Sequence, residues 1–279
     1  MDYVIMIFVR SLIFNILFLI NTFTILIVLL LLNLFMTRKQ CLYLAKIWAH
    51  TNQLLLKYIT RTNIQIEGIE NIPKTGCIIA IKHQSSWDTF FFLTCIEDPI
   101  FILKHTVFYI PIIGLYCIKQ GMIGIKRNSR KLDMKTIINR AQKATTSNRQ
   151  LIIYPEGTRR SPGDAPVYKK GIAHIYDSLA VPVIPIVVHA GLFWPRGKSM
   201  RYPGNFKVRV LKPIPAGIPR TIFFTDLQEK MEYESNKLLL ETIHDNPKLN
   251  LPKSAQKALR QLQENTELNL IFLYIGILL

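Results

Sequence analysis

A histidine and an aspartate five residues apart are the first chemically suggestive feature of this sequence. They are His83 and Asp88, in the segment KHQSSWDTF at residues 82–90, directly after the apolar run 77–81. On one continuous helix this separation turns the two side chains about 140° apart, so they meet only if the chain bends between them. A strand that runs into a helix supplies that bend. We therefore expect His83 at the end of a buried strand and Asp88 in the first turn of a helix.

A carboxylate beside an imidazole makes a general base. The carboxylate fixes the tautomer of the ring and stabilises the imidazolium that forms when the ring takes a proton. The same two residues could also be a helix cap and a surface histidine. The pair by itself therefore leaves the function open.

A second group of polar residues, PEGTR at 155–159, follows the apolar run 151–154. Open α/β sheets bind ligands in the loops at the carboxyl ends of their strands. Gly157 allows a ligand to approach the backbone closely, and the planar guanidinium of Arg159 suits a phosphate group. Glu156 could hold that guanidinium in place or be an ordinary turn residue. Alone, this segment is as consistent with a solvated turn as with a site.

Three more cations follow predicted strands. Lys126 and Arg127 come at the end of one strand, and Lys104 follows the apolar run 100–103. They could bind an anion or be surface charges, which is the commoner role of such residues. The run VPVIP at 181–185 brackets the entry into a strand with prolines, and its expected role is structural.

Short apolar runs alternate with segments of helical periodicity along most of the chain. This alternation predicts an α/β fold with a mixed, largely parallel sheet flanked by helices. In the run 206–211, apolar residues alternate with Lys207 and Arg209, so we expect that strand to have one wet face and to lie near an edge. The expected strands are 64–67, 77–82, 100–103, 122–126, 151–154, 183–188 and 206–211, and the expected helices are 86–96, 129–147, 170–179, 225–243 and 253–265.

The N-terminal region predicts a membrane anchor. Residues 11–37 are 27 consecutive uncharged positions, more than the roughly 20 that cross a bilayer as a helix. A signal peptide would have a shorter apolar region and a small-residue cleavage site. Basic residues follow the segment, which places the rest of the chain on the cytoplasmic face. Whether the segment spans the membrane or lies in one leaflet stays open, and an amphipathic helix at 41–60 could pack on the domain or lie on the headgroups.

These patterns divide the chain into three parts: 1–62, a membrane anchor and amphipathic helix; 63–250, an α/β domain; and 251–279, a C-terminal helix and apolar tail. The apolar tail at 268–279 is too short to span a bilayer.

The charge balance favours anionic partners. The chain has 35 Lys and Arg against 18 Asp and Glu, a formal net charge of +17. The cations are spread along the chain without interleaved aromatic residues, which argues against nucleic acid. The 4 cysteines form no CxxC pair and the 6 histidines have no metal-ligand spacing, so we expect reduced thiols and no metal site.

Four blocks occur in a characteristic order: HxxxxD from His83 to Asp88, a block at 121–127 that ends in Arg127, PEGTR at 155–159, and the proline-containing run at 181–185. Their content and order resemble the glycerolipid acyltransferase family, typified by lysophosphatidate acyltransferase. The resemblance covers about residues 63–215, and an N-terminal membrane anchor is also typical of the family.

The resemblance implies a role for each block. His83 would be the general base that deprotonates a glycerol hydroxyl, and Asp88 would orient it. The hydroxyl would attack the thioester of the donor directly, without an acyl-enzyme. Lys104 would neutralise the phosphate or the developing oxyanion. The phosphate-binding residues implied are Arg127, Glu156, Gly157, Thr158 and Arg159. His105 and Lys126 depart from the acidic residues that many members have at these two positions.

The family resemblance also predicts the reaction and its partners. The expected activity is transfer of a fatty acyl group to the sn-2 hydroxyl of 1-acyl-glycerol-3-phosphate, forming phosphatidate. Acyl-CoA or acyl-carrier protein would be the co-substrate, with no cofactor and no metal. Membrane phospholipid and lysophospholipid are the expected partners, and the oligomeric state stays open. The alternatives are acylation of another lysolipid or of glycerol 3-phosphate, and a non-catalytic membrane scaffold that binds anionic lipid.

Overall fold

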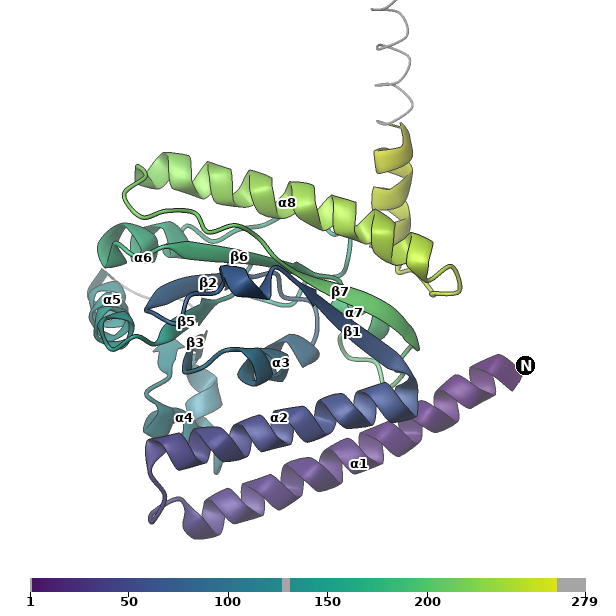
Figure 1. The fold of residues 1–279 in the computed structure, drawn as a ribbon, viewed down its shortest axis with the longest axis horizontal. Helices are drawn as coiled ribbons and strands as arrows, with labels where there is room; N and C mark the ends of the chain where they lie inside the picture. The colour runs from purple at the N-terminus through teal and green to yellow at the C-terminus, as the bar shows by residue number, and fades with distance from the viewer. Residues whose placement is uncertain (1, 127–130, 265–279) are drawn as a thin grey trace, which may run out of the picture.

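The centre of the molecule is a mixed, mostly parallel β-sheet (Figure 1). The computed structural model describes residues 2–126 and 131–264, and within them the strands form one seven-stranded sheet in the order β1-β7-β6-β2-β5-β3-β4. Only the β6–β7 pairing is antiparallel. The strands are β1 Thr62–Glu67, β2 Cys77–Ile81, β3 Pro99–Lys104, β4 Ile123–Ile125, β5 Gln150–Ile153, β6 Val183–Val188 and β7 Gly204–Val210. The predicted fold class is confirmed.

Helices cover both faces of the sheet. Figure 1 shows α8 lying across one face beside α6, while α3 and α2 lie under the other face and α1 is outermost. Residues 253–264 form a further helix. The helices are α1 Asp2–Leu32, α2 Arg38–Thr60, α3 Trp87–Cys95, α4 Ile113–Gln120, α5 Lys131–Thr146, α6 Gly171–Leu179, α7 Ala190–Phe193 and α8 Arg220–Asp245, with short 3-10 turns η1 Ile69–Asn71 and η2 His105–Tyr109.

The strand β2 lies in the middle of the sheet and is wholly buried. All five of its residues are buried, and it lies between β5 and β6 with both pairings parallel. A strand in this position has helices over both faces, which explains why its sequence is wholly apolar instead of alternating. The segment that follows β2 therefore leaves from a fixed point in the core.

The strand β7 lies one position from the edge formed by β1, as its alternating sequence predicted. The expected wet face is instead partly covered. Arg209 donates hydrogen bonds to Glu67 of β1 at 2.8 Å and to Glu241 of α8 at 2.7 Å, and Lys207 donates to Glu241 at 3.2 Å. Acidic residues of α8 thus take the place of water, which the periodicity of the strand alone could not reveal.

The two N-terminal helices run side by side along the α/β domain (Figure 1). α1 buries one face, on which Ile7, Ser11 and Phe14 recur at helical spacing. The ring of Phe14 lies edge-on to Trp194, with 5.3 Å between centroids. Residues Tyr3–Leu32 are nevertheless long and apolar enough to cross a membrane. α2 packs one face against the domain, the commoner of the two alternatives for this helix.

Most predicted elements are present with ends shifted by a few residues. The short helices α4 and α7 were not predicted, and α8 begins at Arg220, five residues before the expected start at 225. The apolar tail at 268–279 lies outside the described residues. The three-part division of the chain stays a prediction.

Candidate active site

The structure brings His83 and Asp88 together at the carboxyl end of β2. The chain leaves the strand at Ile81 and enters α3 at Trp87, which supplies the bend that the spacing requires. The Nδ1 atom of His83 lies 3.1 Å from Oδ2 of Asp88. Asp88 is fully buried, whereas 13% of the His83 side chain is exposed. The pair therefore has a protected carboxylate and an accessible ring.

Asp88 also fixes the loop that carries the histidine. Its Oδ2 atom accepts the backbone N–H groups of Gln84 at 2.6 Å and Ser85 at 2.8 Å. With Nδ1–H donated to this same oxygen, the lone pair of His83 lies on Nε2. Nε2 is thus the atom that can take a proton from a substrate.

A tyrosine ring stacks against one face of the histidine ring. Tyr154, directly after β5, stacks on His83 with 4.1 Å between ring centroids and donates its hydroxyl to the backbone oxygen of Asp88 at 2.9 Å. Burial, together with the nearby Asp88 charge, raises the pKa of Tyr154 well above its ordinary value. Tyr154 is therefore a neutral platform that limits rotation of the His83 ring.

The PEGTR turn is attached to the same loop. The backbone N–H of Arg160 donates to the carbonyl of His83 at 2.7 Å, and the guanidinium of Arg159 donates to Ser86 Oγ at 2.6 Å. Gly157 has a φ of 65°, a conformation that glycine adopts without strain. Thr158 is half-buried in this turn. Arg159 therefore presents its planar head beside the segment that carries the histidine.

Glu156 turns away from Arg159 and into the protein. One carboxylate oxygen accepts the backbone N–H of His83 at 3.0 Å, and the other lies 3.6 Å from Nζ of Lys82. Burial raises the pKa of Glu156, and the charge of Lys82 opposes that rise. The sequence suggested that Glu156 could hold Arg159. Its described contacts are with Lys82 and His83 instead.

The remaining predicted cations follow neighbouring strands of the same sheet edge. Lys104 ends β3 and is exposed, and among the described residues no hydrogen bond or ion pair joins it to the histidine. Arg127 lies outside the described residues, two positions after the end of β4. Because β2, β5, β3 and β4 are adjacent and parallel, their carboxyl ends lie along one edge.

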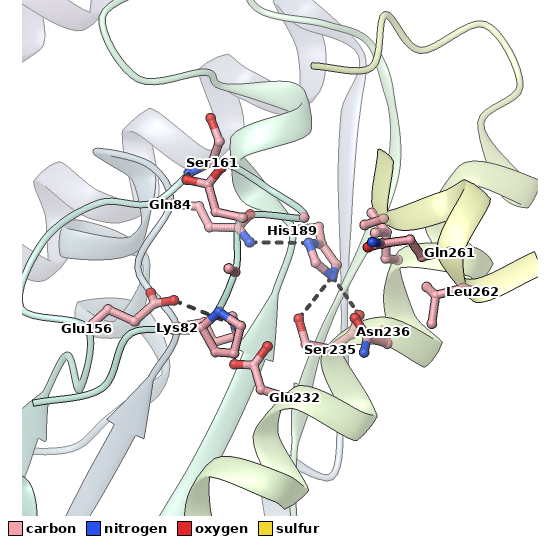
Figure 2. A pocket seen from close by; sticks show the side chains of 16 residues that line it. Lys82, Gln84, Glu156, Ser161, His189, Glu232, Ser235, Asn236, Gln261 and Leu262 are labelled. Carbon is pink, nitrogen blue, oxygen red and sulfur yellow. Dashed lines mark hydrogen bonds and ion pairs between the residues drawn. The ribbon is translucent and has the colours of Figure 1, made fainter. Parts of the chain in front are cut away.

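A cavity of about 330 Å³ lies beside this loop, between α8 and the segment after the PEGTR turn (Figure 2). Its lining includes Lys82, Gln84, His189 and Glu232. His189 contacts Gln84 and Ser235, and burial lowers its pKa to about 4. His189 is thus a buried histidine that is neutral near pH 7 and joins the histidine loop to α8.

Sequence reasoning missed three residues of this region. Tyr154 directly precedes PEGTR and was included only as the end of a strand, and Lys82 was included only as the end of a strand. A cation directly after a wholly apolar run was a usable signal for a buried ion pair. Glu232 is 150 residues from Lys82, and no local pattern connects the two.

Part of this chain is similar to known acyltransferases. Residues 63–189 match the family model described as Acyltransferase. A 1-acyl-sn-glycerol-3-phosphate acyltransferase of Pseudomonas aeruginosa is 29% identical over 171 residues, which cover 61% of this chain and 66% of the relative. A chloroplastic protein of the same description from Brassica napus is 30% identical over 181 residues, covering 63% of this chain and 51% of the relative.

Animal relatives and a solved structure agree with this match. The mouse 1-acyl-sn-glycerol-3-phosphate acyltransferase alpha is 29% identical over 162 residues, 57% of each protein. The chain thus spans about half to two thirds of the length of the curated relatives it matches. The crystal structure of the 1-acyl-sn-glycerophosphate acyltransferase from Thermotoga maritima superimposes with a TM-score of 0.66 at 20% identity, covering 82% of this chain and 97% of that one. That likeness shows the fold.

Proposed function

We propose that this chain, whose residues 63–189 match the Acyltransferase family model, transfers a fatty acyl group from acyl-CoA or acyl-carrier protein to the sn-2 hydroxyl of 1-acyl-glycerol-3-phosphate, forming phosphatidate. The observation that carries the proposal is the buried Asp88 held against an accessible His83 at the carboxyl end of a core strand. The names of the relatives support the choice of acceptor.

His83 acts as the general base in this proposal. Its Nε2 atom takes the proton of the acceptor hydroxyl as the oxygen attacks the thioester carbonyl. The tetrahedral intermediate then collapses, the carbon–sulfur bond breaks, and the imidazolium returns the proton to the departing thiolate. Asp88, 3.1 Å from Nδ1, stabilises the imidazolium between these two steps. The transfer is direct and uses no cofactor besides the acyl donor.

Arg159 binds the acceptor phosphate, because a planar guanidinium makes paired hydrogen bonds to phosphate oxygens. Its hydrogen bond to Ser86 Oγ supports this role by keeping its head near the histidine loop. Lys104, at the end of β3, adds positive charge beside this turn, and the family resemblance assigns Arg127 to the phosphate as well. Gly157 and Thr158 shape the turn from which Arg159 extends.

The membrane supplies the acceptor. The outward face of α1 carries exposed apolar residues over its whole length, among them Val4, Phe8, Leu12, Leu19, Phe23 and Ile27. Its other face is held along the domain, where Ser11 and Asn15 bond the backbone of Arg201 and Ser199. This contact favours α1 lying along one leaflet over standing across the bilayer. In this arrangement the basic residues after α1, Arg38 and Lys39, favour the anionic leaflet of the cytoplasmic face.

Acyl transfer by the purified full chain in lipid vesicles tests the proposal. Each acceptor, namely 1-acyl-glycerol-3-phosphate, a second lysolipid and glycerol 3-phosphate, is supplied with acyl-CoA and with acyl-carrier protein, and products are identified by mass spectrometry. We expect phosphatidate from the wild type and a loss of roughly 10²- to 10⁴-fold in His83→Ala. His244→Ala is the matched control, since 90% of that side chain is exposed.

Each outcome has a separate meaning. Full activity of His83→Ala would remove His83 from the mechanism. Faster acylation of another acceptor would change the substrate and keep the reaction class. Absence of turnover with every acceptor and both donors would favour the non-catalytic lipid-binding scaffold.

A further inference from the structure

A buried lysine lies directly before the candidate base. Lys82 follows the last residue of β2 and is 5% exposed. Its Nζ atom lies 2.6 Å from Oε1 of Glu232 and 3.6 Å from Oε1 of Glu156, and Figure 2 shows Lys82 with both carboxylates at the cavity beside the loop. A lysine is rarely buried unless its charge is paired. The two carboxylates are therefore what keeps this ammonium in place.

Glu156 connects the lysine to the histidine. Its second oxygen accepts the His83 backbone N–H at 3.0 Å, while the His83 carbonyl accepts from Arg160 N at 2.7 Å. Both backbone polar groups of His83 are thus held, one by Glu156 of the PEGTR turn and the other by Arg160, which directly follows it. Glu156 is 3% exposed, and without a neighbouring cation a buried carboxylate takes up a proton or moves toward water. Either change would weaken the hydrogen bond that Glu156 accepts from the backbone N–H of His83.

Glu232 extends this connection to α8. It accepts from Lys82 Nζ and, at 2.7 Å, from the hydroxyl of Tyr168. α8 packs on β6 and β7, far along the chain from the histidine loop. The covering helix therefore supplies the charge that completes the buried cluster of Lys82, Glu156 and Glu232.

We propose that Lys82 and Glu232 are positioning residues for the acyl transfer inferred above: they hold Glu156 against the His83 backbone and so fix the loop that carries the base. The inference rests on the proposed function. Neither residue has a described contact with the His83 ring or with Asp88. Their effect reaches the base through Glu156.

The first test measures kcat and KM of Lys82→Met and Glu232→Gln in the vesicle assay. Because a base misplaced by about 1 Å loses on the order of a hundredfold in rate, we expect kcat per folded enzyme to fall at least about tenfold in Lys82→Met, with the KM for the acceptor within about twofold. In Glu232→Gln the amide oxygen still accepts the hydroxyl of Tyr168, so the kcat of this variant should fall less than that of Lys82→Met. Lys230→Met is the matched control on α8, because its ion pair with Asp226 lies at the surface.

A second mutation separates positioning from a loss of folding. In Lys82→Met/Glu156→Gln, the amide oxygen at residue 156 can accept the His83 N–H without needing a cation. We expect the double variant to recover most of the kcat that Lys82→Met loses. A double variant as slow as Lys82→Met would overturn the inference.

Amide hydrogen exchange of the peptide that contains His83 gives a readout without turnover. Faster exchange in Lys82→Met than in the wild type and Lys230→Met is expected, and equal exchange in all three would overturn the role of Lys82. If the wild type transfers no acyl group, the proposed function fails. The exchange experiment then still decides whether Lys82 stabilises the loop that carries His83. Unchanged kcat in both single variants of an active enzyme would also overturn the inference.

Discussion

Replacing Asp88 by asparagine removes the charge of the proposed dyad while keeping its shape. Oδ2 accepts from His83 Nδ1, Gln84 N and Ser85 N, whereas the buried Oδ1 has no hydrogen-bond partner among the described residues. An asparagine must therefore point its amide oxygen at these three donors and put its NH₂ group where Oδ1 was. That NH₂ group is buried and unpaired, as Oδ1 already is in the wild type, so the change in stability should not exceed about 1–3 kcal/mol. The loop should keep its conformation.

The effect on catalysis follows from the lost charge. For unit charges at the 3.1 Å of this contact, Coulomb's law with an effective dielectric constant of about 20 gives roughly 5 kcal/mol of imidazolium stabilisation. The asparagine still accepts the Nδ1 hydrogen bond, and neutral hydrogen bonds are about half as strong as charge-assisted ones. We therefore expect a loss of roughly 3 kcal/mol of transition-state stabilisation, about a hundredfold in kcat.

The assay compares kcat of Asp88→Asn with the wild type, using phosphatidate formation in vesicles, after circular dichroism and a melting curve have shown that the variant is folded. Asp226→Asn, which removes a partly exposed acidic charge from α8, is the control and should retain full activity. A folded Asp88→Asn enzyme with kcat within about threefold of the wild type would refute the proposed function of this charge.

Three further predictions concern the phosphate, the pH dependence of stability and the docking of α1. Arg159→Gln should raise the KM for 1-acyl-glycerol-3-phosphate by roughly 10- to 100-fold, because a charge-assisted hydrogen bond contributes about 1.5–3 kcal/mol; an unchanged KM would place the phosphate elsewhere. Burial lowers the pKa of His189 from 6.5 to about 4, so between these values the unfolded chain binds a proton that the folded chain does not. Acidification from pH 7 to pH 4 should then remove on the order of 3 kcal/mol of stability, and the difference in melting temperature between wild type and His189→Gln should shrink as the pH falls; a constant difference would contradict this. Phe14→Ala should lower the free energy that holds α1 on the domain by about 3–5 kcal/mol, since Phe14 is fully buried. Limited proteolysis should therefore cleave α1 faster in this variant than in the control Leu12→Ala, which alters the exposed face. Equal cleavage in the two variants would show that Phe14 does not hold α1.

Local sequence was sufficient wherever a short segment controls its own structure. The apolar run before His83 required a buried strand, and a separation of five residues required a bend, so the contact between His83 and Asp88 could be predicted from the residues between 77 and 88. The placement of polar groups at the carboxyl ends of strands followed in the same way, because buried parallel strands share one functional edge.

The sequence by itself determined the fold class, the apolar N-terminal helix and the contact between His83 and Asp88. The spacing of buried residues along an element and a bend in the chain each depend on only a few neighbouring residues. Only the tertiary structure decided that Glu156 faces Lys82, that Glu232 of α8 completes the buried cluster, and that α1 packs on Trp194. A buried charge takes its partner from whichever helix covers that end of the sheet. That choice depends on strand order and long-range packing, which no local pattern encodes.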